Sequence, residues 1–195
     1  MESQILDVRS VPKTERHPRI FAAYDALAAA ESFVLVNDHD PKHLRDEFDR
    51  EHPGSFGWDY EGREDGDWRV RISKLTSTPL PRIVGDSAAE GNSGAVWNLS
   101  PRDRTLDANV ISLPAGDGIA EHAGPDLDVL VHVVSGSGTL STERGDVELV
   151  PGALVWLPKR SRRAFTAGSD GLRYLTVHQR KKMLGLSPRP VGSAG

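Results

Sequence analysis

The hydrophobic positions in the first third of the chain alternate between strand-like and helix-like spacing. Residues 5–8 predict a short strand, and residues 18–27 carry apolar side chains at the intervals of one helix face. Pro18 is suited to the first turn of that helix. The continuous apolar run at 33–36 predicts a strand that is buried on both faces.

A second helix and a strand pair complete this part of the pattern. Asp40 and Pro41 fit the N-cap and first residue of a helix whose inward face holds Leu44 and Phe48. Beyond it, aromatic and β-branched residues alternate with polar ones, which predicts two antiparallel strands at 56–60 and 68–72, joined around residues 62–66. The expected order is β-α-β-α-β-β, a two-layer fold in an α+β protein.

Residues 76–94 are rich in Ser, Pro, Gly and Ala and predict a linker after a first domain at residues 1–75. Short strands separated by turn residues follow, which is typical of an all-β barrel or sandwich at residues 95–182. They are expected at 96–99, 109–113, 129–134, 139–141, 147–150, 154–157 and 172–178. Residues 143–145 predict a hairpin turn, and residues 183–195 a flexible tail.

Composition narrows the function classes. The chain has 195 residues, a net charge of −4 and no cysteine, so disulfides, thiolate metal sites and cysteine nucleophiles are excluded. The N-terminus lacks the pattern of a signal peptide, and no apolar run is long enough to cross a bilayer. We expect a cytoplasmic protein that does not associate with membranes.

The C-terminal part of the chain is basic. Between residues 150 and 190 Asp170 is the only acidic residue among nine lysines and arginines. Such a patch could hold nucleic acid or an acidic partner. Aromatic residues do not interleave with these bases in the manner of single-strand binders, so a solvated surface is favoured over nucleic-acid binding.

Two segments of the second half resemble the paired motifs of the cupin family, which are small double-stranded β-helix barrels. The first segment carries Gly116, His122, Gly124, Asp128 and Gly136, and the second carries Gly152, Pro158 and Arg163. The resemblance implies a cupin barrel. In the family a metal is held by three histidines and a glutamate; here His122 keeps the first histidine and Asp128 stands for the glutamate, whereas Gly124 and Arg163 replace the other two ligands.

These replacements predict a pocket without a metal. Glycine offers no side-chain donor, and an arginine guanidinium is a permanent cation that would repel a metal ion. Arg163 instead predicts a site for a carboxylate or another anion, or an internal ion pair with Asp128.

The facing of the strand after Asp128 decides which side chains join the site. If Asp128 points inward, alternation places Leu130, His132 and Val134 inside with it. One extra residue separates Asp128 from Gly136 relative to the family pattern, so a bulge or a shifted register with His132 outward is the alternative. With Asp128 inward, Val129, Val131 and Val133 lie on the opposite face of the strand and would be covered by the first domain or by a partner in a homodimer.

Three interpretations of the predicted barrel site remain open. The favoured one is a ligand pocket or polar network made of His122, Asp128, His132 and Arg163, with no cofactor. The second is a divalent transition metal held by His122, Asp128 and His132, with His178 as a further donor. In the third, these residues are ordinary polar groups of the core or rim.

Residues 4–74 resemble an uncharacterised bacterial family, the domain of unknown function 2249. The resemblance rests on Leu6-Asp7-Val8-Arg9, Glu15-Arg16-His17-Pro18, Asn37-Asp38-His39-Asp40-Pro41 and Trp68. It implies a two-layer fold similar to the small sulfur-carrier proteins. Their working cysteine is absent and Lys13 lies near the matching place, so sulfur relay is excluded.

His17, Asp38, His39 and His43 form a second candidate site in this first domain. His39 and His43 have the spacing that puts two imidazoles on one helix face, as metal or haem ligation can require. The alternative is that they are exposed residues at the start of a helix. Arg9, Arg16 and Arg19 could bind an anion there, but pairing with local acidic residues is favoured.

The sequence as a whole favours a protein that binds a small, anionic molecule without catalysis. Arg163 would anchor the anion, His122 would add a hydrogen bond and Asp128 would orient the arginine. A metal-dependent cupin enzyme of the dioxygenase or isomerase type is one alternative. An interaction or scaffold protein is the other.

Overall fold

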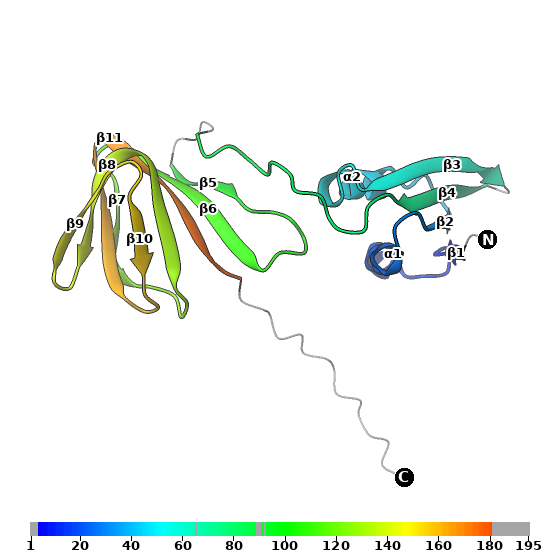
Figure 1. Cartoon of the computed structure of the whole chain (residues 1–195), viewed down its shortest axis with the longest axis horizontal. Coiled ribbons are helices and arrows are strands. Elements are labelled where there is room, and N and C mark those ends of the chain that lie inside the picture. Colours follow the sequence, from blue (N-terminus) through cyan, green and yellow to red (C-terminus); the bar gives the residue numbers. More distant parts are fainter. Residues whose placement is uncertain (1–3, 65, 89–90, 92, 181–195) are drawn as a thin grey trace, which may run out of the picture. The chain divides into compact units, whose positions relative to one another are not determined.

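The computed structural model describes residues 4–64, 66–88, 91 and 93–180, and its elements are shown in Figure 1. Contacts between residues divide the chain into two compact units, Met1–Ile83 and Val84–Gly195. Each unit contains one β-sheet, and both described helices lie in the first unit. The predicted tail at 183–195 lies outside the described residues.

The first unit is a four-stranded sheet with two helices. Its elements in chain order are β1 (Gln4–Asp7), α1 (Lys13–Ala26), β2 (Ser32–Asn37), α2 (Lys42–Glu51), β3 (Phe56–Glu64) and β4 (Asp67–Lys74). The strand order in the sheet is β1-β2-β4-β3. β1 and β2 are parallel, as a helical crossover between them allows, and the other neighbours are antiparallel.

The core of the first unit forms where both helices contribute side chains to one cluster with β2 and β4. Leu44 and Phe48 of α2 are buried, as their spacing predicted. Five of the six residues of the central strand β2 are buried, which confirms the prediction for the apolar run at 33–36. Phe21 of α1 stacks on Phe48 with ring centroids 4.5 Å apart, so aromatic packing joins the two helices.

The predicted helix starts were wrong in both cases. Helix α1 begins at Lys13, so Pro18 lies inside the helix and not in its first turn. Pro41, not Asp40, is the N-cap of α2, and no side chain caps that end. Asp40 instead accepts a hydrogen bond from the Tyr60 hydroxyl at 2.9 Å. Asp40 thus contacts Tyr60 on β3 and does not cap α2, and the sequence pattern gave no sign of this contact.

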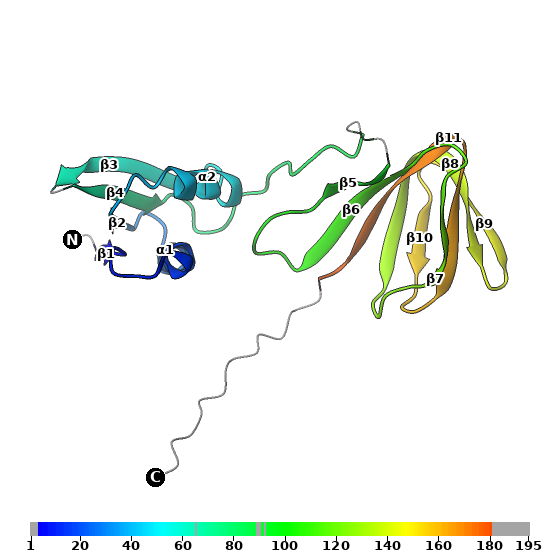
Figure 2. The same cartoon turned by 180° about the vertical axis from the view of Figure 1, so that it is seen from behind.

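The second unit is a seven-stranded sheet. Its strands are β5 (Gly94–Asn98), β6 (Leu106–Leu113), β7 (Gly118–Ala123), β8 (Val129–Thr142), β9 (Gly145–Leu149), β10 (Leu154–Leu157) and β11 (Arg162–Gln179). β8 and β11 run side by side and are long enough for their two halves to pair with different neighbours, as Figure 2 shows from behind. The first half of β11 pairs with β7 and its second half with β6.

The expected closed barrel is not what the described residues form. The main strand path, β10-β8-β11-β6-β5, has two ends, and β7 and β9 add to β11 and β8 off that path. The long strands bend where their register shifts, between Ala167 and Leu172 of β11. Gly136 of β8 has a φ of 75°, and a Cβ there would fall 2.1 Å from the Gly171 carbonyl oxygen. Glycine is therefore required at the bend.

The bend brings both halves of the sheet onto one core. Val131 and Val133 from the first half of β8 join Leu140 from its second half in the same buried cluster. Phe165 and Tyr174, from opposite halves of β11, stack with ring centroids 5.1 Å apart. The arrangement is a sheet folded over itself around a core that is open at its edges.

Strand β7 and the first half of β11 were not predicted. Both contain many charged or small residues, so the alternation of apolar and polar side chains that marks a strand is weak in their sequences. They are strands because their backbones pair with each other. The predicted turn at 143–145 agrees with the structure, where Thr142 pairs with Gly145 across the loop. In the part of the chain that the structure describes, no helix has the length and apolar character of a membrane span.

Candidate functional site

Arg163 is the buried cation of the second unit. It lies at the start of β11 opposite His122 of β7, and its side chain is only 5% exposed. The Nη1 group donates a hydrogen bond of 2.9 Å to the Ser161 hydroxyl and a longer one of 3.4 Å to the Ser161 carbonyl oxygen. Among the described residues, no carboxylate forms an ion pair with Arg163.

Burial changes the protonation equilibria around Arg163. Loss of hydration lowers the pKa of the guanidinium, while the interaction with the Tyr174 phenol opposes that change. Burial raises the pKa of Tyr174 to about 12, against a smaller opposite effect of Arg163. Tyr174 is therefore a neutral phenol at physiological pH, so it does not neutralise the arginine.

Gly124 provides the space that the guanidinium occupies. A Cβ at this position would lie 2.0 Å from Nη1 and 2.3 Å from Cζ of Arg163. Real Cβ atoms do not approach other atoms so closely, so any larger residue at 124 requires Arg163 to move. The two residues that differ from the cupin motif, Gly124 and Arg163, thus depend on each other sterically: the arginine fits only because residue 124 has no side chain.

Asp128 does not pair with Arg163, and this part of the prediction was wrong. Its Oδ1 accepts a hydrogen bond of 2.9 Å from the backbone N–H of Lys159. Close by, Arg160 donates its backbone N–H to Pro125 and its side chain pairs with Asp126 at 3.0 Å. Asp128 therefore helps to join the loop before β8 to the loop before β11.

His122 pairs in register with Arg163, but among the described residues neither His122 nor His132 forms a hydrogen bond with the guanidinium. His122 is exposed, and its Nδ1 lies 2.9 Å from the Ala120 carbonyl oxygen. His132 is on the outer face of β8, because the alternate positions Val131 and Val133 fill the core. The outward register considered as the alternative is therefore the observed one, and the prediction that His132 faces inward was wrong.

An open cleft of about 310 Å³ lies beside Arg163. One group of its lining residues is apolar: Leu140, Val147, Val155, Trp156, Leu157 and Pro158. The other group is polar: Thr142, Glu143, Arg144, Ser161, Arg162 and Arg163. Among the described lining residues there are three arginines and one carboxylate, so positive side chains outnumber negative ones.

Ser161 was missed as a site residue. It precedes Arg163 by two positions, and alternate residues of an extended chain share a face, so the spacing alone could have indicated it. The sequence predicted no strand at 162–167, so the alternation that places Ser161 and Arg163 on one face was not apparent. The walls from β9 and β10 could not be found from sequence, since only the folding of the sheet brings them to β11.

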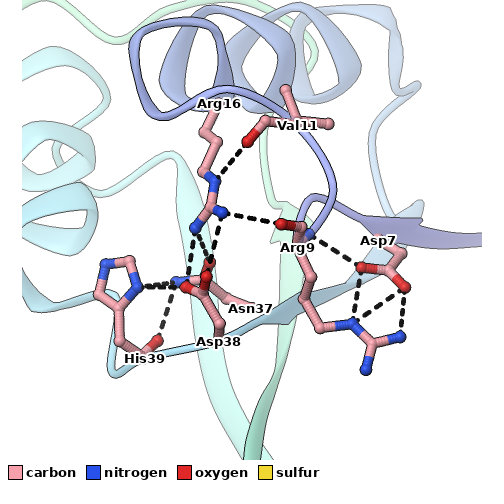
Figure 3. A network of polar contacts seen from close by, with 7 residues as sticks. All are labelled: Asp7, Arg9, Val11, Arg16, Asn37, Asp38 and His39. Carbon is pink, nitrogen blue, oxygen red and sulfur yellow. Dashed lines mark hydrogen bonds and ion pairs between the residues drawn. The ribbon is translucent and has the colours of Figure 1, made fainter.

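In the first unit, Arg16 is at the centre of a polar network that is shown in Figure 3. Its Nη1 and Nη2 donate to the two carboxylate oxygens of Asp38 at 2.7 and 3.0 Å. Its Nε donates to Val11 and its Nη2 to Arg9, both at backbone carbonyl oxygens 2.9 Å away. The bonds to Arg16 lower the pKa of Asp38 well below its usual range, with a further contribution from His39.

This network assigns Arg16 and Asp38 to structure. The guanidinium is 7% exposed, and all of its nitrogens donate to protein acceptors, including Asn37 Oδ1 at 3.3 Å. It ties the start of α1 to the end of β2. No donor of Arg16 is left for an anion, so the interpretation of local acid pairing agrees with its geometry.

The histidines of the second candidate site border one recess of about 30 Å³, which is the size of a water molecule or an ion. His17 Nδ1 lies 2.8 Å from Glu47 Oε1, and His39 Nδ1 lies 2.6 Å from Asp38 Oδ1. His43 is 98% exposed at its side chain, 4.0 Å from Asp46. Each imidazole thus has a local acidic neighbour.

The described residues of the two units offer no ready ligand set for a metal. Within the described ranges, no group of three or more His, Cys, Asp or Glu residues is placed to hold an ion. In the second unit, Gly124 has no side chain to offer a donor. His122 is exposed, Asp128 is hydrogen-bonded to the Lys159 backbone, and His132 lies on the outer face of β8. The residues present do not fit the metal of the cupin family.

Comparison with known proteins gives a family for the first unit. Residues 5–74 match the model of a family described as "Uncharacterized conserved protein (DUF2249)". No curated protein matches the chain.

Several solved structures are similar to parts of the chain. A cupin protein from Bacteroides fragilis is 19% identical with a TM-score of 0.41, over 58% of this chain and 99% of that one. The cupin domain of Cnp3 from Schizosaccharomyces pombe is 15% identical with a TM-score of 0.45, over 54% and 80%. BH2720 from Bacillus halodurans is 15% identical with a TM-score of 0.37, and the match spans 40% of this chain and 65% of that chain. The chain thus combines a segment that matches the DUF2249 family, at residues 5–74, with structural similarity to proteins of the cupin fold.

Proposed function

We propose that the second unit binds a small anion without catalysing a reaction, with Arg163 as the anchor. One observation carries the proposal. Arg163 is 5% exposed as a residue, its guanidinium has no carboxylate partner among the described residues, and it lines a cleft of about 310 Å³.

The energetic reason is the cost of burying an unpaired charge. Removing an ion from water costs several kcal/mol even after the protein relaxes, and an opposite charge with good geometry offsets much of that cost. Ser161 supplies only neutral acceptors to Arg163. An anion in the cleft would supply the missing opposite charge.

The roles of the neighbouring residues differ from those expected from sequence. Ser161 orients the guanidinium through Nη1, in place of Asp128. Gly124 leaves room for it, and Tyr174 lies near as a neutral group. His122 and His132 do not line the cleft and take no part in the proposed binding.

The chemistry of the cleft supports binding over catalysis. Glu143 is the only carboxylate among its described lining residues, and no histidine lines it. Glu143 lies in an exposed hairpin turn between β8 and β9. General acid–base catalysis requires groups positioned to exchange a proton with the substrate.

The test compares ligand responses of the full chain with those of two variants. Arg163→Met keeps an unbranched stem but removes the charge, and Arg160→Met removes an exposed cation from the same segment. Thermal shift and calorimetry with acetate, benzoate, sulfate and inorganic phosphate should show at least one anion whose affinity falls about 10- to 100-fold in Arg163→Met, corresponding to the loss of a charge-assisted hydrogen bond. Arg160→Met should bind as the unchanged protein does. Equal affinities in Arg163→Met and the unchanged protein would refute the proposal.

A second candidate function is self-assembly, favoured by an exposed apolar face. Leu154 and Trp156 on β10 are 69% and 63% exposed, and Trp156 pairs in register with Leu130, which is 45% exposed. β10 is also at one end of the strand path, so one of its edges is unpaired. A second copy of the chain related by a two-fold axis would cover these residues on both partners at once. Sedimentation equilibrium of Trp156→Lys against the unchanged protein tests this, and a concentration-independent monomer in both would rule it out.

A further inference from the structure

The open donors of Arg163 lie on one edge of its guanidinium. Its recorded hydrogen bonds run from Nη1 to Ser161. The Nε and Nη2 groups have no acceptor among the described residues. These two N–H groups are parallel and lie in one plane, which is the geometry that a carboxylate accepts through both oxygens.

The hydroxyl groups in the cleft are already used. Ser161 Oγ donates to the Pro158 carbonyl oxygen at 2.8 Å, and it accepts the Nη1 bond of Arg163. Thr142 Oγ1 donates to the Gly145 carbonyl oxygen at 2.7 Å. Neither hydroxyl has a proton left for a ligand, so these side chains cannot supply the additional donors that phosphate or sulfate oxygens require.

The remaining cations of the cleft are exposed. Arg162 is exposed, and its Nε donates to Glu121 Oε1 at 3.0 Å. Arg144 is exposed in the turn between β8 and β9, next to Glu143. The interior of the cleft thus offers one guanidinium edge, and any second anionic group would be limited to the rim.

Apolar side chains form the other walls. Leu140 and Leu157 belong to the buried core, Val155 packs against it, and Val147 is 43% exposed at the entrance. An oxygen atom directed at these walls would lose its hydrogen bonds to water without replacement, which is unfavourable. A hydrocarbon group there would instead be removed from water, which is favourable.

We propose that the ligand of this cleft is a monocarboxylate with an apolar body, bound by its two oxygens to Nε and Nη2 of Arg163 and by its hydrocarbon part against Leu140, Val147, Val155 and Leu157. The inference rests on the proposed anion-binding function and specifies its ligand class. The volume of about 310 Å³ is at the lower end of the range for small-molecule sites, which limits the body to a short chain or one ring.

The experiment is a calorimetric titration of the full chain with acetate, butyrate, hexanoate and inorganic phosphate, repeated with Arg163→Met. Burial of one methylene stabilises a complex by about 0.8 kcal/mol, so the affinity should rise about fourfold for each methylene until the cleft is full. Phosphate should bind Arg163→Met and the unchanged protein equally weakly. Hexanol, which has the chain but no charge, should not bind measurably.

A wall variant separates the apolar contact from the charge. Val155→Thr replaces one methyl group by a hydroxyl at nearly constant volume, so it should lower the affinity for hexanoate severalfold and leave that for acetate unchanged. Its melting temperature, compared with that of the unchanged protein, establishes that the fold is intact.

The possible outcomes distinguish the two proposals. Phosphate binding that depends on Arg163, with no effect of chain length among the carboxylates, would overturn the ligand class and leave anion binding standing. A dicarboxylate such as succinate binding more tightly than butyrate would also overturn the monocarboxylate. Absence of any response that depends on Arg163 would overturn the proposed function itself, and the inference with it.

Discussion

Gly124 and Arg163 lie so close together that a Cβ on residue 124 would fall 2.0 Å from Arg163 Nη1. The guanidinium of Arg163 thus occupies the volume that a side chain at position 124 would need. Because the two residues belong to different motif segments, neither can be changed without consequences for the other.

The first prediction follows from this contact. Gly124→Ala should displace the guanidinium, lower the stability of the second unit by about 1–3 kcal/mol, and weaken anion binding as strongly as Arg163→Met. Thermal unfolding and calorimetry measure the two effects.

Ala123→Thr is the matched control for this prediction. It adds atoms one residue earlier at an exposed position of β7, so it should change stability by no more than about 0.5 kcal/mol. If Gly124→Ala binds anions as the unchanged protein does, the guanidinium has another position from which it can act, and the role of Gly124 is refuted.

The second prediction concerns metal ions. Protein purified without chelator should contain no stoichiometric zinc, iron, manganese or nickel, because Gly124 offers no donor atom and the Arg163 cation beside it repels divalent ions. Elemental analysis by mass spectrometry measures the content, and His122→Ala should not change it. One equivalent of metal that disappears in His122→Ala would show that the side chains rearrange around an ion.

The third prediction is a loss of stability of the first unit in acid, caused by Asp38. Its pKa is lowered in the folded state by Arg16, so between that pKa and the unfolded value near 3.8 the unfolded chain binds more protons. The stabilisation is therefore complete above about pH 4 and is lost as the pH falls further. Chemical unfolding as a function of pH should show this slope.

Asp38→Asn should remove that slope and destabilise the first unit by about 1–3 kcal/mol, since the buried Arg16 loses its charged partner. Asp46→Asn is the control, because Asp46 is 67% exposed and only 4.0 Å from the exposed His43. An identical acid slope in Asp38→Asn and the unchanged protein would assign the effect to other carboxyl groups.

The fourth prediction concerns His52 and a higher pH range. Burial among aromatic rings lowers the pKa of His52, and its ring centroid is 4.7 Å from that of Tyr24. The unfolded chain therefore takes up a proton at His52 before the folded protein does. Stability should be fully present above about pH 6.5 and should decrease as the pH falls below it.

His52→Phe keeps an aromatic ring in the cluster and removes the titration, so the stability of this variant should vary less between pH 7 and pH 5. His43→Phe, at a side chain that is 98% exposed, should keep the dependence of the unchanged protein. A steeper dependence in His52→Phe would mean that protonated His52 stabilises the fold.

Much of the first unit could be predicted because its signals are local. The apolar run at 33–36 and the pair Leu44 and Phe48 are buried as expected. The errors at Pro18 and Asp40 concern the first residue of each helix. A single contact outside the helix, such as that of Asp40 with Tyr60, can shift the position at which a helix begins. Arg16 looked like one of several surface arginines and is a buried structural residue, because its acceptors come both from the nearby backbone before α1 and from Asp38, which is 22 residues away.

In the second unit the strand pattern could not reveal the bends. β8 was predicted as two strands because its glycine-rich middle lacks side-chain alternation, yet the backbone continues through Gly136. The inward positions change from odd to even numbers along β8, from Val133 to Leu140. His132 was placed on the wrong face because the alternation was counted from Asp128, which is itself exposed, whereas Val131 and Val133 are buried.

The sequence by itself determined the chemical inventory of this protein: no cysteine, a glycine at position 124, an arginine at position 163, and enough β-forming segments for an all-β second half. Only the tertiary structure decided which of those groups meet. Arg163 is hydrogen-bonded to Ser161, whereas Asp128 accepts a hydrogen bond from the Lys159 backbone, and β9 and β10 contribute walls of the cleft. The sequence states which residue stands at each position, but a site also depends on the distances between residues from remote segments. Those distances are set by how the sheet bends.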